Sequence, residues 1–293
     1  MATLSALLWL GCEPVFVDVE PNSFCLSSEL LWQRLRNEPD ISGALPVHIY
    51  DLACDVESLE DICREHGVTL VYDAAQAFGS CYKGRSLLGY SICGFLATKI
   101  FHTAEGGCVI SPSAEAHKAL SLARALALIN DDHYNLGING KMSELHAAMG
   151  LAFWDGTDAE IEWRKQLYAV YGEALKDLRP IRPAVREGLE WNYAYYPILL
   201  PDERCRSRVE RFLSVQNIHP RRYFYLSLNT LSYLKSEWRS PCNVAEDAAK
   251  RVLCLPMYGE LRRKMSCIWH KAYSQHYVMA YRRFNNGSYF SLH

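Results

Sequence analysis

The 293-residue sequence lacks the short motifs that most directly indicate a metal or a nucleotide. Its 11 cysteines contain no Cys-x-x-Cys pair, and no metal site is predicted. It has neither a G-x-G-x-x-G nor a G-x-x-x-x-G-K-[ST] motif, which disfavours a dinucleotide-binding or P-loop protein. Its formal net charge of −2 provides no basic field, so no nucleic-acid partner is expected.

Long apolar runs are also absent from the sequence. The opening residues, MATLSALLWLGCEP, have no basic leading region, and their apolar run is too short to cross a membrane. Scattered thiols without a secretion signal are typical of a reducing compartment, where most cysteines act as small core residues. We therefore expect a cytoplasmic protein that does not associate with a membrane. The length is sufficient for two domains.

The first half of the chain contains short apolar runs that alternate with amphipathic stretches. The predicted strands are 14–19, 42–50, 68–73, 91–97 and 106–112. The predicted helices between the first three strands are 27–38 and 55–67, and the second has an Asp cap and a Gly stop. Continuous apolar strands separated by helices predict an α/β fold with a mostly parallel sheet that is covered on both faces.

The pattern becomes helical beyond Pro112. The predicted helices are 114–130, 143–154 and a long one from about 158 to 178. After a boundary at 178–183, a strand at 192–200 and a helix at 203–216 predict a smaller α+β domain. We expect a large domain at 1–155, followed at 156–293 by a long connecting helix and the small C-terminal domain.

Lys99 and Asp73 are the candidate catalytic residues. Ligands of open α/β sheets bind at the carboxyl ends of strands, where Asp73 ends a predicted buried strand and Lys99 follows the next one along the chain. A lysine amine and a carboxylate in this arrangement suit pyridoxal 5'-phosphate (PLP), because the amine bonds to the cofactor and the carboxylate keeps the pyridine nitrogen protonated. Two structural alternatives remain open: Lys99 closes a hairpin on the surface, or Asp73 caps the next helix.

Six ordered blocks of sequence resemble the DegT/StrS family of PLP-dependent nucleotide-sugar aminotransferases. The blocks are PVFVDVEPNSFCL, LPVHIY, VYDAAQAFGSCYKG, ATKIFHTAEGG, GINGKMSELHAAMGL and RRYFY with LNTL. The resemblance extends from Met1 to about Leu261 and implies the aspartate-aminotransferase-like fold (fold type I). It also implies a homodimer with active sites at the subunit interface, and a reaction that moves an amino group from glutamate to a nucleotide-linked 4-keto-6-deoxy sugar. Members that form dTDP-4-amino-4,6-dideoxyglucose have the most similar motifs.

The resemblance also implies roles for individual residues. Lys99 matches the lysine that bonds to PLP, and Asp73 matches the partner of the pyridine nitrogen. Gln76 matches the residue against the cofactor ring, and Asn139 the residue that reaches the partner subunit's phosphate site, although a turn-forming Asn is the alternative. The substrate-side positions are His48, Tyr50 and Tyr223. Two alternatives remain open: burial alone could explain His48 and Tyr50, and the segment with Tyr223 could simply present the charges of Arg221 and Arg222 to solvent.

Three departures from the family pattern lead to a second hypothesis. Gly94 and Leu96 occupy the positions of a phosphate-binding Ser and a His in the family's SFHATK motif. The segment with a Gly-Thr loop that normally precedes Met1 is absent from the sequence, and the sequence after about Leu261 diverges. These departures predict weak PLP binding and poor turnover. The alternative function is therefore that of a non-catalytic relative that keeps the fold or the dimer surface.

Overall fold

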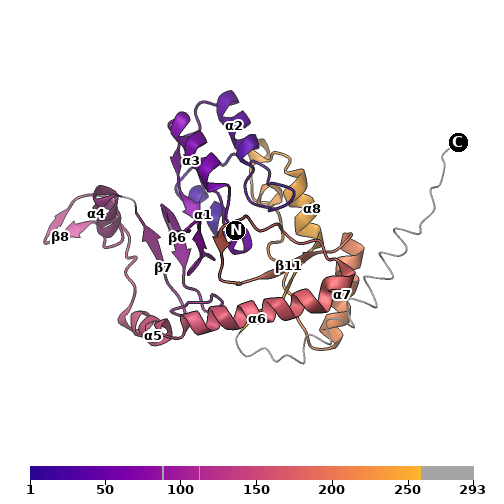
Figure 1. Ribbon diagram of the computed structural model, residues 1–293. Helices are drawn as coiled ribbons and strands as arrows, with labels where there is room; N and C mark the ends of the chain where they lie inside the picture. The colour runs from indigo at the N-terminus through magenta and orange to yellow at the C-terminus, as the bar shows by residue number, and fades with distance from the viewer. Residues whose placement is uncertain (88, 112, 259–293) are drawn as a thin grey trace. The chain divides into compact units, whose positions relative to one another are not determined.

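The computed structural model describes residues 1–258 except 88 and 112, and the chain forms two compact units (Figure 1). Unit 1 comprises Met1–Leu31, Glu162–Val185 and Tyr195–His293, and unit 2 comprises Trp32–Ile161 and Arg186–Ala194. The predicted boundary at 155 lies close to one change of unit, but the first 31 residues group with the C-terminal half. The two predicted domains stay a prediction, and the predicted divergence after Leu261 lies outside the described residues.

The centre of unit 2 is a row of short strands. They are β1 (Gly43–Ala44), β2 (Thr69–Leu70), β3 (Tyr72–Asp73), β6 (Ser91–Gly94) and β7 (Gly107–Ile110). β1 pairs parallel with β2, β3 pairs parallel with β6, and a parallel bridge joins Val47 to Asp73. β6 and β7, side by side in Figure 1, are antiparallel. The segments 43–48, 69–73 and 91–94 all run in the same direction. His48, Asp73 and Gly94, at their ends, therefore lie at the same edge of the row.

Short helices and hairpins complete unit 2. Its other elements are η1 (Ile49–Asp51), α3 (Val56–Glu65), β4 (Cys81–Tyr82), β5 (Arg85–Ser86), α4 (Ala114–Ala123), β8 (Leu128–Ile129), β9 (Asp132–His133), α5 (Glu144–Trp154) and β10 (Leu189–Glu190). The predicted caps of α3 are confirmed, since the Asp55 carboxylate accepts a hydrogen bond from the Ser58 N–H and Gly67 adopts a φ of +68°. β10, β4 and β5 form a separate antiparallel sheet. α2 (Ser28–Asn37) and α6 (Thr157–Leu175) each contribute residues to both units.

Unit 1 contains the larger apolar core. Its elements are α1 (Ala2–Trp9), η2 (Lys176–Leu178), β11 (Tyr196–Leu199), α7 (Glu203–Val215), η3 (Leu228–Thr230), η4 (Ser236–Trp238), α8 (Asn243–Arg251) and β12 (Val252–Leu255). β11 and β12 pair antiparallel, and every residue of both strands is buried. Residues of α6 and α7, including Tyr171 and Leu213, pack in the same cluster as these strands. The predicted strand and helix of the small domain therefore exist, with β11 and α7 somewhat shorter than expected.

Three predicted elements differ from the structure. The segment 14–19 is not a strand: only Val19 forms a bridge, to Leu26, and Val15 is exposed. The predicted strand 42–50 is extended only in part, because it ends in the 3-10 turn η1. The predicted helix 114–130 ends at Ala123. Three later residues of this range, Leu126, Ala127 and Asn130, have positive φ, a conformation with which a helix cannot continue. No helix in the described part of the chain has both the length and the apolarity to cross a membrane.

Candidate functional site

Lys99 lies in the connection between β6 and β7, so the hairpin alternative describes its place in the chain correctly. Its backbone N–H donates a hydrogen bond to the Leu96 carbonyl at 2.8 Å, and its side chain is half-buried. Burial lowers the pKa of the Lys99 amine, while the charges of Asp73 and Cys93 act in the opposite direction. A lowered pKa raises the fraction of neutral amine, which is the nucleophilic form. Lys99 is therefore a hairpin residue with the electrostatic properties of a reactive amine.

An aromatic cluster supports the loop that contains Lys99. Phe95 and Phe101 are buried, and the Phe101 ring stacks on Phe78 with centroids 4.5 Å apart. Gly150 of α5 lies against the same loop, since a Cβ atom at this position would be 2.8 Å from the Thr103 Cγ2 atom. The loop is therefore held on two sides, by the ring cluster and by α5.

Asp73 lies at the end of β3, as predicted. Its Oδ1 atom accepts a hydrogen bond from the Ala75 N–H at 3.1 Å. The following residues form turns rather than a helix, so the alternative in which Asp73 caps the next helix is wrong. Gly94, at the end of the neighbouring strand β6, lies beside the same turn, since a Cβ atom there would be 3.5 Å from the Ala75 Cβ atom.

Gln76 follows Asp73 in this turn and has a buried amide oxygen. The Oε1 atom finds no hydrogen-bond partner among the described residues. By contrast, its backbone carbonyl accepts a hydrogen bond from the Asn192 Nδ2 atom at 2.8 Å. Since buried polar atoms are generally paired, an unpaired side-chain oxygen held on a fixed backbone is suited to contact a ligand.

His48 and Tyr50 are both buried at the same edge of the strands. The His48 ring stacks on Tyr72 at 4.7 Å, and its Nδ1 atom accepts a hydrogen bond from the Cys54 N–H at 3.2 Å. Burial lowers the pKa of His48 to about 4, so its imidazole is neutral at physiological pH. Tyr50 has a φ of +55°. Burial thus accounts for both residues, and their contact with a substrate stays a prediction.

Asn139 and Tyr223 are distant from these strand ends in the sequence, and each makes contacts of its own. Asn139 of unit 2 is exposed, and its Oδ1 atom accepts a hydrogen bond from the Lys141 amine at 2.5 Å. Tyr223 belongs to unit 1, where its ring meets Tyr195 edge-on at 5.5 Å. Arg222 lies over the Tyr225 ring at 3.5 Å. The structure therefore brings together Lys99, Asp73, Gly94, Gln76 and His48, whereas the roles of Asn139 and Tyr223 stay predictions.

The sequence interpretation missed a polar network behind this site. The buried carboxyl of Asp51 accepts hydrogen bonds from the Ser80 hydroxyl at 2.7 Å and the Asn192 N–H at 2.8 Å. The only sequence signal was an acidic residue directly after an apolar run, and nothing indicated its distant partner.

The register also places Cys93 opposite Cys108 in the β6–β7 hairpin, near Lys99.

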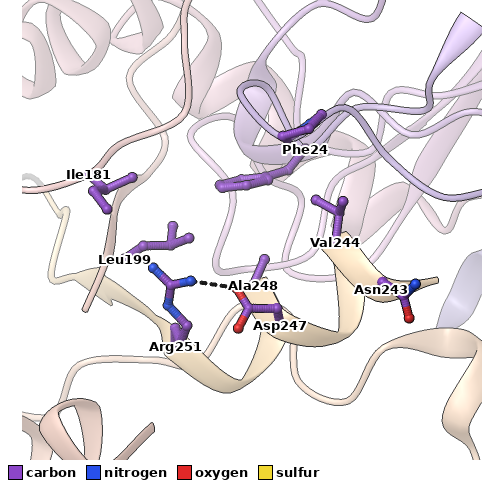
Figure 2. Close-up of a pocket in the computed structure, with 9 residues that line it drawn as sticks. Phe24, Ile181, Leu199, Asn243, Val244, Asp247, Ala248 and Arg251 are labelled. Atoms are coloured by element: carbon purple, nitrogen blue, oxygen red, sulfur yellow. Dashed lines mark hydrogen bonds and ion pairs between the residues drawn. The ribbon is translucent and has the colours of Figure 1, made fainter. Parts of the chain in front are cut away.

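A cavity in unit 1 contains none of the predicted site residues (Figure 2). Its volume is about 370 Å³, and apolar side chains such as Phe24, Leu199 and Val244 line it. Arg251 at this cavity donates a hydrogen bond to the Asp247 carboxylate at 2.5 Å (Figure 2). It also donates to the Leu200 carbonyl at 2.8 Å. Because its charged group is already engaged in this way, the cavity offers less to a ligand than the strand ends of unit 2.

Comparison with known proteins agrees with the family resemblance. The sequence profile of the DegT/DnrJ/EryC1/StrS aminotransferase family matches residues 1–266. A dTDP-4-amino-4,6-dideoxy-D-glucose transaminase from Shigella dysenteriae is 34% identical, over 89% of this chain and 73% of its own length. The Escherichia coli protein of the same name is 31% identical, over 90% of this chain and 74% of its own length.

Solved structures give the same fold. DesI, whose crystal structure was analysed in the presence of its TDP-sugar product, is 29% identical, with a TM-score of 0.85 over 96% of this chain and 75% of its own. A Brucella abortus DegT DnrJ EryC1 StrS aminotransferase has the same TM-score of 0.85 at 23% identity, covering 94% of this chain and 76% of its own, which supports the fold alone. The predicted α/β fold of the aspartate-aminotransferase type is thereby confirmed. The profile match and these relatives show that this chain belongs to the DegT/DnrJ/EryC1/StrS aminotransferase family.

Proposed function

We propose that this chain is a PLP-dependent aminotransferase that transfers the amino group of glutamate to a nucleotide-linked 4-keto-6-deoxy sugar. The observation that supports this function best is the half-buried Lys99 amine, whose pKa burial lowers and which interacts electrostatically with Asp73. The relatives from Shigella dysenteriae and Escherichia coli are named as transaminases of a dTDP-linked amino sugar, which favours this substrate class. Membership of an aminotransferase family favours turnover over the non-catalytic alternative.

The groups at the strand ends fit PLP. The Lys99 Nζ atom would bond to its aldehyde carbon, and the Asp73 carboxylate would hold a proton on its ring nitrogen. The Gln76 amide oxygen, unpaired among the described residues, would face the ring. Gly94 contributes no hydroxyl to the phosphate, and Asn139 of a partner subunit would supply an amide there. When bound, PLP supplies an electron sink for the carbon atom that loses its proton.

The reaction needs a group that accepts a proton from one carbon atom and returns it to another. With PLP bound, the Lys99 Nζ atom would be suited to both steps, because desolvation lowers its pKa and so raises its neutral fraction. In each half of the cycle it would accept a proton from one carbon atom and return it to another: it would take the proton of the glutamate α-carbon in the first half and supply the proton of the sugar carbon that receives nitrogen in the second. His48, Tyr50 and Tyr223 are the proposed substrate contacts.

A homodimer is the proposed assembly, and helix α5 is the region of unit 2 that supports it. The sequence of α5, ELHAAMGLAFW, is apolar almost all round, a composition typical of a helix covered on more than one side. One side is covered by the Lys99 loop, through Gly150. Leu145, Ala148, Leu151 and Ala152 share another side at helical spacing and are all exposed, which leaves an apolar surface for a second copy of this chain.

The three- and four-residue spacing of apolar residues in the sequence predicts a different face, formed by Met142, Leu145, Met149 and Phe153. Met142 precedes α5 and packs against the aromatic cluster of the Lys99 loop, and Met149 is half-buried. Of the predicted face, only Leu145 and Phe153 are exposed. The spacing of apolar residues could not separate the two sides, because both sides of the helix are apolar.

Chemical trapping tests the proposed function. The purified chain is mixed with PLP, its absorbance spectrum is recorded, and the mixture is reduced with borohydride before peptide mapping. We expect an absorbance band of bound PLP and a pyridoxyl group on Lys99. Labelling of Lys83 or Lys141, both exposed, would contradict the assignment. Conversion of a dTDP-4-keto-6-deoxyhexose with glutamate, followed by mass spectrometry of the product, then tests the substrate class.

Light scattering tests the assembly. We expect a dimer for the unmodified chain at micromolar concentration and a monomer for Leu151→Lys, because a charge would be buried in the proposed contact. Lys118→Ala, an exposed substitution on α4, is the control and should remain dimeric. A monomer before any substitution would contradict the proposed assembly.

A further inference from the structure

Asp51 is a buried acidic residue that the proposed chemistry does not use. Its exposed fraction is 0%, and its backbone has a φ of +68° directly after Tyr50 at +55°. Left-handed backbone is sterically unfavourable for residues other than glycine, and here two such residues are adjacent. Such backbone conformations concentrate at functional sites, where other contacts hold them in place. The position of Asp51 therefore calls for a physical reason.

The Asp51 carboxyl joins two segments that are far apart in the sequence. Its Oδ2 atom accepts hydrogen bonds from the Ser80 hydroxyl at 2.7 Å and from the Asn192 N–H at 2.8 Å. Its Oδ1 atom has no partner within the described part of the chain. Burial raises the pKa of Asp51 well above its usual value, which favours the neutral acid. A neutral carboxyl that accepts two hydrogen bonds can be imitated by an asparagine.

Asn192 passes this restraint on to Gln76. The Asn192 Nδ2 atom donates hydrogen bonds to the Gln76 carbonyl at 2.8 Å and to the Phe78 carbonyl at 2.9 Å. The turn that begins after Asp73 is thus held at both ends, by Asn192 near its start and by Asp51 through Ser80. These bonds hold the backbone of Gln76 and leave its side-chain oxygen unpaired among the described residues.

We propose that Asp51 is a positioning residue that acts through Asn192 and Ser80 to hold Gln76 against the cofactor. The proposal rests on the proposed PLP-dependent function. Asp51 need not touch PLP, because each step from its carboxyl to the Gln76 backbone is a direct hydrogen bond. Loss of the two accepted bonds frees the Gln76 turn to move, and misplacement of a binding group weakens cofactor binding without removing any group that touches the cofactor.

A double-mutant cycle with a binding readout tests the proposal. The dissociation constant of PLP is measured by absorbance titration of the full chain, without substrates, for Asp51→Leu, Asp51→Asn, Gln76→Ala and the double variant Asp51→Leu with Gln76→Ala. We expect Asp51→Leu to weaken binding about tenfold, a coupling within the range for residues of one hydrogen-bond network. We expect Asp51→Asn to bind PLP within about twofold of the unmodified chain, since asparagine keeps both accepted bonds.

The double variant separates positioning from general destabilisation. If Asp51 acts through Gln76, Asp51→Leu should cause no further loss in the Gln76→Ala background. Additive losses would overturn the proposal, as would Asp51→Asn binding as weakly as Asp51→Leu. If Asp51→Leu does not fold, Ser80→Ala takes its place in the cycle. We expect Ser80→Ala to weaken PLP binding about threefold, and to cause no further loss in the Gln76→Ala background. Absence of PLP binding by the unmodified chain would instead overturn the proposed function, and this inference with it.

Discussion

The buried arginines of unit 1 are each held by acceptors, whereas several polar atoms near the strand ends of unit 2 have none within the described residues. Arg206 contacts the Glu210 carboxylate and donates to the Lys250 carbonyl at 3.2 Å, and Arg164 donates to the Met257 carbonyl at 2.9 Å. In unit 2, the Tyr72 hydroxyl and the Gln76 Oε1 atom are unpaired among those residues.

This difference distinguishes the two buried arginines of unit 1, which stabilise the fold, from the Gln76 turn of unit 2, which is suited to a ligand. An unpaired buried polar atom is unfavourable by roughly 1–3 kcal/mol, so a protein retains such atoms where something else will pair with them. In unit 1, Arg164 and Arg206 are paired beside the apolar strands β11 and β12, while the Trp163 Nε1 and Arg222 Nε atoms have no hydrogen-bond partner among the described residues. In unit 2, the unpaired Gln76 Oε1 atom lies in the turn that follows Asp73, where a ligand can pair with it.

The largest effect that would sharpen this comparison is expected for Asp73→Asn. We expect the half-reaction with glutamate to slow roughly 10²–10⁴-fold, because an amide cannot hold a proton on the ring nitrogen, while the thermal midpoint changes little. Single-turnover absorbance changes and thermal unfolding measure the two quantities. An unchanged rate would mean that Asp73 has only a structural role, as the acceptor of the hydrogen bond from the Ala75 N–H.

Leu253→Ala should lower the stability of the protein and leave its binding of PLP unchanged. Leu253 of β12 is fully buried in unit 1, so the substitution should lower the free energy of unfolding by about 3 kcal/mol through lost packing. Urea unfolding measures this loss, and Leu10→Ala, at an exposed position, is the matched control with an expected change within about 0.5 kcal/mol. We expect the folded Leu253→Ala protein to bind PLP as the unmodified chain does. A large loss of PLP affinity would contradict the division between the two regions.

An effect of similar size is expected from pH on His48. Since burial lowers its pKa from 6.5 to about 4, the unfolded chain binds the proton more readily. The stabilising contribution of neutral His48 is therefore present above pH 6.5 and lost as the pH falls toward about 4. Over this window the loss amounts to about 3 kcal/mol. The stability difference between the unmodified chain and His48→Asn, from urea unfolding at each pH, should change by this amount, because other titrating groups are common to both.

The smallest effect is expected for Asp18→Ala in unit 1. The Asp18 carboxylate accepts hydrogen bonds from the Val244 and Ala245 N–H groups at 2.9 and 3.0 Å, at the start of α8. Loss of this cap should lower the free energy of unfolding by about 1 kcal/mol. Asp40→Ala, an exposed carboxylate, is the control, and equal effects of the two substitutions in urea unfolding would exclude a capping role.

Helix positions were the most predictable part of the fold. The spacing of apolar residues and the local caps placed α2, α3, α5 and α7 within a few residues, because these signals act between neighbours in the chain. The segment 14–19 was predicted incorrectly for the converse reason. An apolar run indicates a strand only where another strand lies beside it, and here Asp18 instead accepts from the start of α8.

The alternation of strands and helices was enough to predict that Asp73 and Lys99 follow neighbouring strands, since parallel strands end at the same edge of a sheet. Their motif also indicated the family. Only the tertiary structure revealed that Asn192, 141 residues after Asp51, donates to its carboxyl and to the Gln76 carbonyl. Local patterns contain no information about which distant polar groups meet in a core, because such a pair forms only when folding removes both groups from water.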